Sequence, residues 1–377
     1  MKFEFATANR IIFGPGALSD IGALARPLGD RAFILTGRDP SRAEALRALL
    51  QAAGVSSEIF AVPGEPTIDL AEEAAASARN AGANVIVGFG GGSALDAAKA
   101  VAALLANDGQ LLDYLEIIGR NKPLERPSLP CIAIPTTAGT GSEVTRNAVL
   151  ASPHHKLKVS LRSPSMLPRI ALVDPLLTHS LPPSVTAFTG MDALTQLIEP
   201  FVCTRANPFT DGLCREGLMR AARSLLATYR NGGDAAARED MSVASLFGGM
   251  SLANAGLGAV HGLAGPIGGM FDAAHGALCA ALLPHVMRAN ISQTRDAGRF
   301  AEIAQIFTGR RDATADDGAE WVASVVSDLK IPPLSTYGIR REHFTEIAEK
   351  AAASNSMKAN PVQLSIGELN GILEKAL

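Results

Sequence analysis

Three consecutive glycines follow a short apolar run and open an alanine-rich segment. The run covers residues 84–89, the glycines are Gly90, Gly91 and Gly92, and Ser93 begins the next segment. This order predicts a strand, a tight turn and a helix. Glycine lets the backbone approach a ligand closely, and the free N–H groups at the start of a helix bind anions such as a pyrophosphate. The stretch therefore predicts a nucleotide site, although it also fits a turn in which glycine only relieves steric strain.

The segments before this turn alternate between strand and helix patterns. Residues 32–36 and 58–62 are predicted as strands, and residues 41–53 and 67–81 as helices. Ser41 with Glu44 fits a capping box at the first helix, and Thr67 fits an N-cap at the second. The βαβαβ order predicts a Rossmann-like parallel sheet, whose ligands bind at the carboxyl ends of the strands.

A second loop of small residues follows the apolar run 131–134. It spans residues 135–145 and carries the hydroxyls of Thr136, Thr137, Thr140 and Ser142 among glycines. Such a loop offers N–H and O–H donors to phosphate or ribose, or it is a connector without a ligand. Residues 147–150 and 158–161 are predicted to pair as a hairpin, and residues 170–173 to form the last strand.

The pattern changes at residues 181–183, where we expect a domain boundary between residues 1–180 and 181–377. Beyond it nearly every segment has helical spacing, with Gly or Pro between most segments. The expected helices cover residues 185–201, 208–230, 235–255, 275–291, 298–307, 314–329, 342–354 and 366–377. The fold class is thus an α/β domain followed by an all-α domain.

Composition excludes several classes of protein. The 377 residues carry a net charge of −3 without a basic block, which argues against a nucleic-acid partner. No apolar stretch is long enough to span a membrane, and the first residues lack the apolar core of a signal peptide, so we expect a cytoplasmic protein. The four cysteines have no CxxC spacing and are expected to be free buried thiols.

A candidate metal site lies in the helical half. Asp192 and Gln196 are four residues apart and share one helix face. His261 is expected near the end of a helix that Gly265 and Pro266 break, and a loop at residues 267–271 would bring His275 back. One carboxylate and two imidazoles suit a divalent metal. Alternatively, Asp192 caps a helix and the histidines are ordinary polar core residues.

Four motifs together resemble the iron-containing (group III) alcohol dehydrogenases, which have a dehydroquinate synthase-like fold. The motifs are Gly90-Gly91-Gly92-Ser93-x-x-Asp96-x-x-Lys99, residues 135–143, residues 190–195 and residues 254–261, and the resemblance runs from about residue 14 to residue 286. It implies a nucleotide-binding α/β domain, a helical metal-binding domain and a substrate cleft between them.

The resemblance also implies roles for individual residues. Fe²⁺ or Zn²⁺ would be held by Asp192, Gln196, His261 and His275. Of these, Asp192, His261 and His275 would also be the catalytic residues. The implied contacts to NAD(P)(H) are Gly37, Arg38, Gly90, Gly91, Gly92, Ser93, Asp96, Thr136, Thr137, Thr140, Ser142 and Lys158. The family usually has histidine at the position of Gln196 and a proton-transferring histidine at that of Gly265, so this chain departs from the pattern twice. A carboxamide is a weaker ligand than imidazole, and the metal is expected to be loosely bound.

These features predict an oxidoreductase that moves a hydride between NAD(P)(H) and a small alcohol, aldehyde or ketone polarised by the metal. We expect a homo-oligomer, such as a dimer, with neither nucleic acid nor membrane as partner. Three alternatives stay open: a metal-independent enzyme like maleylacetate reductase, a dehydroquinate-synthase-like lyase, and a nucleotide-binding protein that has lost catalysis. The threonine and glycine pattern of residues 137–141 argues against the first, and the lack of a lysine-rich site argues against the second.

The cofactor preference can be predicted from the end of the first long strand. Family members that prefer NAD usually have an aspartate there, whereas this chain has Gly37 and Arg38 after Thr36. A 2′-phosphate is then not repelled, and an arginine is near to pair with it. We predict that NADP(H) is accepted at least as well as NAD(H). Steady-state kinetics that gave a kcat/KM for NADH more than about tenfold above that for NADPH would contradict this.

Overall fold

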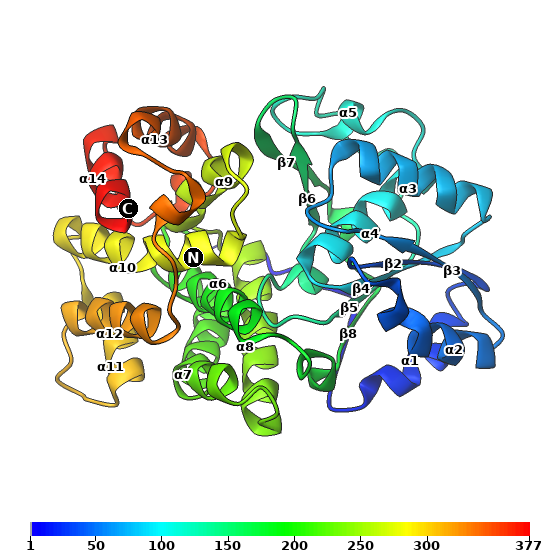
Figure 1. The fold of residues 1–377 in the computed structure, drawn as a ribbon, viewed down its shortest axis with the longest axis horizontal. Helices are drawn as coiled ribbons and strands as arrows, with labels where there is room; N and C mark the ends of the chain where they lie inside the picture. The colour runs from blue at the N-terminus through cyan, green and yellow to red at the C-terminus, as the bar shows by residue number, and fades with distance from the viewer. Residues whose placement is uncertain (1) are drawn as a thin grey trace. The chain divides into compact units, whose positions relative to one another are not determined.

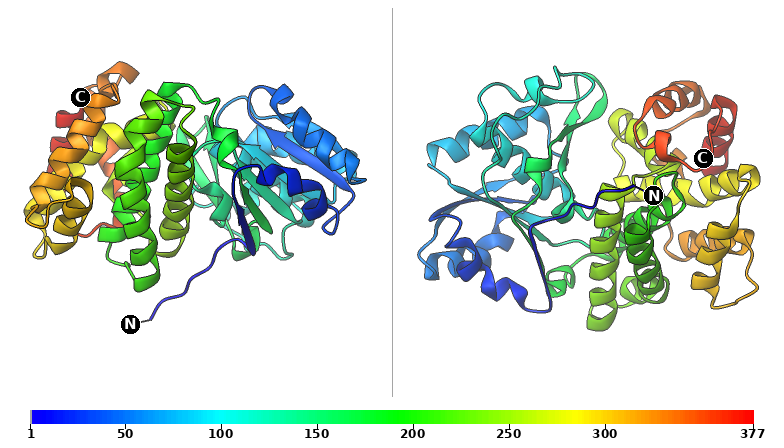
Figure 2. Two further views of the ribbon diagram at one scale, coloured as in Figure 1. Left: turned by 90° about the horizontal axis from the view of Figure 1, so that it is seen from below. Right: turned by 180° about the vertical axis from the view of Figure 1, so that it is seen from behind.

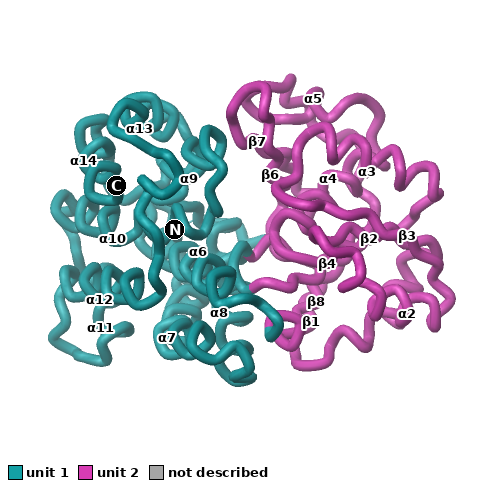
Figure 3. The backbone as a smooth tube through the Cα atoms, viewed as in Figure 1, with its two compact units in different colours: residues 1–6, 138–140, 179–377 teal, residues 7–137, 141–178 magenta. Residues whose placement is uncertain are grey.

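The computed structural model describes residues 2–377, and their contacts divide the chain into two compact units (Figure 3). The α/β unit comprises residues 7–137 and 141–178, and the helical unit comprises residues 2–6, 138–140 and 179–377. The sequence does not predict that two short segments, at residues 2–6 and 138–140, belong with the helices.

The α/β unit is built on a six-stranded sheet in the order β1-β8-β5-β4-β2-β3. Every neighbouring pair is parallel, which confirms the predicted sheet. The edge strand β1 is an addition that the sequence does not predict. The strands are β1 (Arg10–Phe13), β2 (Arg31–Thr36), β3 (Ser56–Ala61), β4 (Val85–Gly90), β5 (Cys131–Pro135) and β8 (Ile170–Val173).

Helices cover both faces of this sheet (Figure 1). Along β2, Phe33 and Leu35 pack with α3 (Ile68–Asn80) and α4 (Gly92–Ala106). The alternate residues Ala32 and Ile34 pack with α1 (Ile21–Ala25) and α2 (Glu44–Ala52). Because both faces are buried, the central strands are continuous apolar runs without polar alternation.

The other predicted elements of this unit are mostly confirmed. β6 (Asn147–Ser152) and β7 (Leu157–Arg162) form the expected antiparallel hairpin, and a short helix α5 spans Leu111–Tyr114. The Thr67 hydroxyl caps α3 by accepting from the N–H of Leu70.

The predicted Ser41–Glu44 capping box is wrong. A 3₁₀ turn at Pro40–Ala43 precedes α2, and Asp39 is its cap, accepting from both the N–H and the hydroxyl of Ser41. Pro40 favours this earlier start because its fixed φ suits the first position of a helical turn. Glu44 instead pairs with Arg47 on the surface.

Within the described residues 179–377, the helical unit contains nine α-helices, α6–α14. Three of them, α6, α7 and α8, run side by side (Figure 2). α6 is buried on nearly all sides from Gly190 to Val202 and forms the centre of the core. The helices are α6 (Pro183–Val202), α7 (Pro208–Arg230), α8 (Ala235–Asn254), α9 (Ala259–Met270), α10 (His275–Gln293), α11 (Gly298–Thr308), α12 (Ala315–Asp328), α13 (Phe344–Ala353) and α14 (Ile366–Ala376).

The region around His261 differs from the prediction. α9 continues through Gly265 and Pro266 to Met270, so residues 267–270 are helical instead of a loop. His261 is the third residue of α9 and does not lie near a helix end at Gly265. Proline costs this helix one hydrogen bond to Gly262, and burial of Leu263, Pro266 and Ile267 offsets that cost.

Helices α8 and α9 meet at a bend of 95°. Among residues 2–377 no single helix is long and apolar enough to cross a membrane. Only α8 and α9 taken together have the necessary length and apolar composition.

A buried lysine joins the two glycine-rich motifs of the α/β unit. The Lys99 side chain has no exposed surface, and its ammonium pairs with Asp96 at 3.0 Å. It also donates to the Ser142 carbonyl at 3.0 Å and to the Thr145 hydroxyl at 2.9 Å. Asp96 in turn accepts from the Ser142 hydroxyl and from the N–H of Val149. The spacing of Asp96 and Lys99 on α4 therefore fixes the loop at residues 141–145.

Replacing Lys99 with methionine should destabilise the α/β unit by about 3–5 kcal/mol, because the partners of a buried charge lose their counterpart. The melting temperature should fall by about 10 °C in circular dichroism or fluorimetry. Lys122→Met is the control, because Lys122 is half exposed and its pair with Asp113 lies on the surface. Equal melting temperatures for the two variants would contradict a structural role of Lys99.

Candidate functional site

The glycine turn lies at the carboxyl end of β4, as predicted. Gly91 is the N-cap of α4 and no side chain caps this helix end among residues 2–377. The N–H groups of Gly92 and Ser93 open the helix and have no intrahelical acceptor. An added Cβ at Gly90 would lie 2.7 Å from Ala94 Cβ, so Gly90 is needed for packing. At Gly91 the added Cβ would meet only the Thr137 side chain, at 3.3 Å. The turn thus has the open amides and the lack of side chains that a pyrophosphate requires.

Gly37 lies beside this turn at the end of the neighbouring strand. Its N atom is 3.5 Å from the position of an added Cβ at Gly90, and its own added Cβ would meet nothing within 4 Å. Arg38 is exposed, and its Nε donates to the Pro63 carbonyl at 3.1 Å. The nearby Asp39 is occupied as a helical cap, and its bonds with Ser41 lower the pKa of its carboxyl.

Other predicted cofactor contacts have partners within the protein. Lys158 is not a solvated lysine, because its side chain is 11% exposed and its ammonium lies 2.5 Å from Glu65. The oxygens of Asp96 and the hydroxyl of Ser142 bond to each other, as described above. Thr136 is buried in the α/β unit, and its N–H donates to the Gly90 carbonyl at 2.9 Å. Thr140 belongs to the helical unit, whereas Thr137 belongs to the α/β unit.

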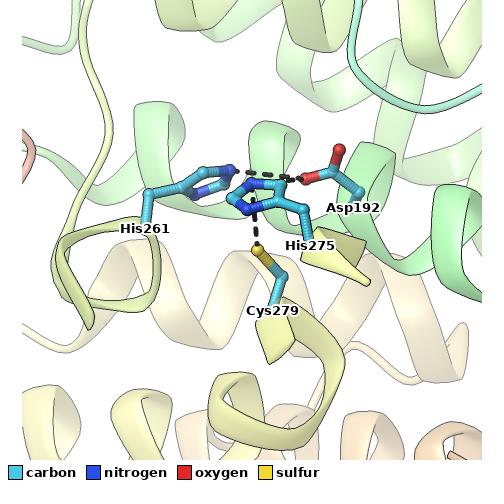
Figure 4. Close-up of side chains that lie close together, drawn as sticks. All are labelled: Asp192, His261, His275 and Cys279. Carbon is cyan, nitrogen blue, oxygen red and sulfur yellow. Dashed lines mark hydrogen bonds and ion pairs between the residues drawn. The ribbon is translucent and has the colours of Figure 1, made fainter. Parts of the chain in front are cut away.

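The candidate metal ligands meet inside the helical unit. α6 supplies Asp192, α9 supplies His261, and α10 supplies His275 and Cys279, and the four side chains converge on one point (Figure 4). Asp192 Oδ1 lies 3.4 Å from His261 Nε2 and 3.8 Å from His275 Nε2. One ligand atom from each of the four residues lies within 4.8 Å of the others. The structure therefore brings together Asp192, His261 and His275, although they are far apart in sequence.

Three buried atoms around this point lack hydrogen-bond partners among residues 2–377: Asp192 Oδ1, Gln196 Oε1 and His261 Nε2. A buried polar atom without a partner costs free energy, and native proteins rarely keep several together. A divalent cation would suit such atoms, because carboxylate, carboxamide and imidazole are lone-pair donors to metals. The residues present fit a metal ion, and they do not fit the alternative in which Asp192 caps a helix, since Asp192 is inside α6.

Glu199 was not predicted, and it orients one of these ligands. Its carboxylate is 4% exposed, lies 2.6 Å from His261 Nδ1 and accepts the N–H of Val260 at 2.7 Å. Nδ1 bonded to a carboxylate leaves Nε2 directed at the metal, which is the usual arrangement around histidine ligands. The signal in the sequence was the spacing: Asp192, Gln196 and Glu199 share one face of an otherwise apolar helix.

Cys279 was predicted only as a free buried thiol, and all four cysteines are indeed free and buried. Its sulfur lies 3.6 Å from His275 Nε2, one helical turn further along α10. The spacing of four residues from His275 is the same as that of Gln196 from Asp192, and it is the signal that would have identified Cys279.

The electrostatics of the cluster favour an ionised Asp192. Burial opposes ionisation, but His261, His275 and the Gln196 carboxamide outweigh it and hold the pKa of Asp192 below its usual value. Burial raises the pKa of the Cys279 thiol to about 11, so the thiol is neutral at pH 7 when no metal binds it.

The second departure from the expected pattern, Gly265, lies on α9 one turn after His261. An added Cβ there would meet nothing within 4 Å. The structure thus has space at this position, and no side chain at it to carry a proton.

The contact between Glu199 and His261 leads to a prediction for metal binding. In Glu199→Gln the shape is kept and an amide oxygen can still accept from Val260, but the negative charge beside His261 is lost. The metal Kd should rise by roughly 10–100-fold in chelator competition, as for other changes to groups that orient metal ligands. Glu320→Gln, in an exposed surface ion pair, is the control and should leave the Kd unchanged. An unchanged Kd in Glu199→Gln would show that Glu199 serves only the start of α9.

Comparisons with known proteins agree with this geometry. The family profile described as "Iron-containing alcohol dehydrogenase" matches residues 8–175, and "Fe-containing alcohol dehydrogenase family, C-terminal" matches residues 186–377. Long-chain-alcohol dehydrogenase 1 of Geobacillus thermodenitrificans is 36% identical, with 97% of this chain and 96% of the relative covered. The 1,3-propanediol dehydrogenase of Klebsiella pneumoniae is 34% identical, with 99% and 98% covered.

Solved structures give the same result. A 1,3-propanediol oxidoreductase has a TM-score of 0.93 at 33% identity, and both chains are covered completely. The sulfoacetaldehyde reductase of Bifidobacterium kashiwanohense, solved in complex with NAD⁺, has a TM-score of 0.90 at 26% identity, with 100% of this chain and 99% of that chain covered. With profiles that match both its halves, relatives aligned over nearly its whole length and a cluster of buried metal-ligand atoms, this chain belongs to the iron-containing alcohol dehydrogenase family.

Proposed function

We propose that this protein uses NAD(P)(H) and a divalent metal to interconvert a small alcohol and the corresponding aldehyde or ketone. The proposal rests on three buried atoms that can bind a metal and have no hydrogen-bond partner among residues 2–377. They belong to Asp192, Gln196 and His261, and His275 lies beside Asp192 and His261. We also infer that residues 1–180 form the nucleotide-binding domain and residues 181–377 the metal-binding domain. A cytoplasmic location and a homo-oligomeric state remain predictions from the sequence.

Asp192, His261 and His275 would hold the metal, and the Gln196 carboxamide would lie within reach of it, directly or through one water. When bound, the metal supplies a Lewis acid that polarises a carbonyl oxygen or lowers the pKa of an alcohol. Asp192 provides the negative charge of the site, and Glu199 keeps the His261 ring in the orientation that presents Nε2.

The glycine turn would hold the cofactor. The N–H groups at the start of α4 suit its pyrophosphate, and Gly37 with Arg38 leaves space and a positive charge for an adenosine ribose or its 2′-phosphate. Asp96 and Ser142 also fix the loop at residues 141–145, because the Ser142 hydroxyl donates to the Asp96 carboxylate. Direct contacts of Ser93, Thr136, Thr137, Thr140, Asp96, Ser142 and Lys158 with the cofactor are part of this proposal.

The substrate class follows from the names of the relatives, which act on long-chain alcohols, 1,3-propanediol and sulfoacetaldehyde. We infer a small-molecule alcohol, aldehyde or ketone for this chain. Because Gly265 carries no proton-transferring side chain, the proton on the substrate oxygen would be exchanged through water or the cofactor ribose.

Removal of the metal tests the proposal. Protein stripped with a chelator should lose turnover of NADPH or NADH with a panel of small aldehydes and ketones, and added Fe²⁺ or Zn²⁺ should restore it. Asp192→Ala should bind no metal and show no turnover, because the charged ligand is gone. Asp211→Ala, which removes a carboxylate elsewhere in the helical unit, is the control for a lost negative charge.

The outcomes separate the alternatives. Full activity of metal-free protein would favour a metal-independent reductase, and cofactor binding without turnover in any metal form would favour a protein that has lost catalysis.

A further inference from the structure

Cys279 belongs to the metal cluster, but the family resemblance assigns it no role. It is completely buried on α10, one turn after His275, so both side chains project from the same face of the helix. Cys214 and Cys131 are equally buried in apolar surroundings, but neither belongs to the cluster.

Three of the separations within the cluster are close to the edges of a coordination tetrahedron. Zinc bonds of about 2.0–2.1 Å to nitrogen or oxygen and about 2.3 Å to sulfur separate neighbouring ligand atoms by about 3.3–3.6 Å. Here the Cys279 sulfur lies 3.6 Å from His275 Nε2, and Asp192 Oδ1 lies 3.4 Å from His261 Nε2 and 3.8 Å from His275 Nε2. The other separations among the four ligand atoms are within 4.8 Å, so the four side chains are close enough to bind one ion after local adjustment.

Two other side chains of the cluster also direct potential metal-ligand atoms at the same point. Asp192 Oδ1 and His261 Nε2 point into the cluster from side chains that are more than nine-tenths buried, and neither has a hydrogen-bond partner among residues 2–377. The set therefore comprises one oxygen, two nitrogens and one sulfur, contributed by three helices.

We propose that Cys279 is a protein ligand of the metal, as a thiolate, and that its sulfur makes the site prefer Zn²⁺ to Fe²⁺. The inference rests on the metal-dependent function proposed above and identifies the metal that this site selects. Binding of the ion displaces the thiol proton to water and forms a metal–sulfur bond.

The chemistry of the donor set supports this preference. Sulfur ligands favour zinc over iron(II) in mixed sites with imidazole, and zinc already lies above iron(II) in the general order of affinity. With Cys279 as the fourth ligand, Gln196 would not bind the metal directly, and its carboxamide would act on the site by lowering the pKa of Asp192. A zinc ion held by these four residues would have to take a substrate oxygen as a fifth ligand, as catalytic zinc sites do in the transition state.

X-ray absorption at the zinc edge is the direct test on the full-length protein. Zinc-loaded wild type should show one sulfur neighbour at about 2.3 Å. Cobalt-loaded wild type should show a thiolate-to-cobalt charge-transfer band in the near ultraviolet. Both signals should disappear in Cys279→Ala and persist in Cys214→Ala, which removes an equally buried thiol from α7, and in Gln196→Ala.

Competition with a chelator under anaerobic conditions measures the selectivity of the site between Zn²⁺ and Fe²⁺. Cys279→Ala should raise the Kd for Zn²⁺ by roughly 100-fold, at least the effect of altering a group that only orients a ligand. The Kd for Fe²⁺ should rise much less, so that the preference for zinc falls. Circular dichroism and melting temperature establish that each variant is folded.

Failure of this inference is distinguishable from failure of the proposed function. Wild-type protein that binds zinc and cobalt stoichiometrically without a sulfur signal, or Cys279→Ala that keeps the signal, would overturn the role of Cys279 and leave a metal-dependent enzyme. Wild-type protein that binds neither ion would overturn both proposals.

Discussion

The buried carboxylate of Glu199 is the contact on which the metal site depends. A carboxylate with 4% exposure needs strong hydrogen-bond partners, and here they come from the first residues of α9: the N–H of Val260 and the His261 ring. The N–H of Ala259 donates to the side chain of Asn360. The first N–H groups of α9 are therefore bonded by side chains distant in sequence, and its N-cap residue provides no side-chain hydrogen bond. The interaction that starts the helix is therefore also the one that orients His261 toward the cluster.

The same reasoning explains why polar residues are tolerated in the centre of the helical core. α6 carries Asp192, Gln196 and Glu199 on one face while its other faces pack against apolar side chains. Each of the three costs free energy on burial, and a cation together with the start of α9 compensates for that cost. A metal-free core of this composition would keep several buried acceptor atoms without hydrogen-bond donors, which is unusual in a native protein.

Sequence alone predicted the elements whose signals are local. The glycine turn, the parallel strands and most helices follow from periodicity and from caps such as Thr67. The four-residue spacing also placed Asp192 with Gln196. The elements that could not be predicted depend on residues distant in sequence. The strand β1 forms by pairing with β8. The helix α9 continues through Pro266 because the burial of its side chains outweighs the loss of one hydrogen bond. Cys279 was interpreted only as a buried thiol although it lies in the helix predicted for residues 275–291, because the sequence does not show which face of that helix meets Asp192 and His261.

The charge of the donor set bears on the pKa of a bound alcohol. One carboxylate and three neutral ligands leave a divalent ion with a net charge of about +1, whereas a thiolate in place of one neutral ligand brings the total to about zero. A neutral centre attracts a substrate oxygen less strongly and lowers the pKa of a bound alcohol less. Oxidation of an alcohol and reduction of the corresponding aldehyde pass through the same alkoxide, which loses a proton in forming from the alcohol and gains one after reduction of the aldehyde. A thiolate ligand at Cys279 would therefore raise the pH at which a bound alcohol ionises, and with glycine at position 265 the proton would be exchanged through water or the cofactor ribose in both directions.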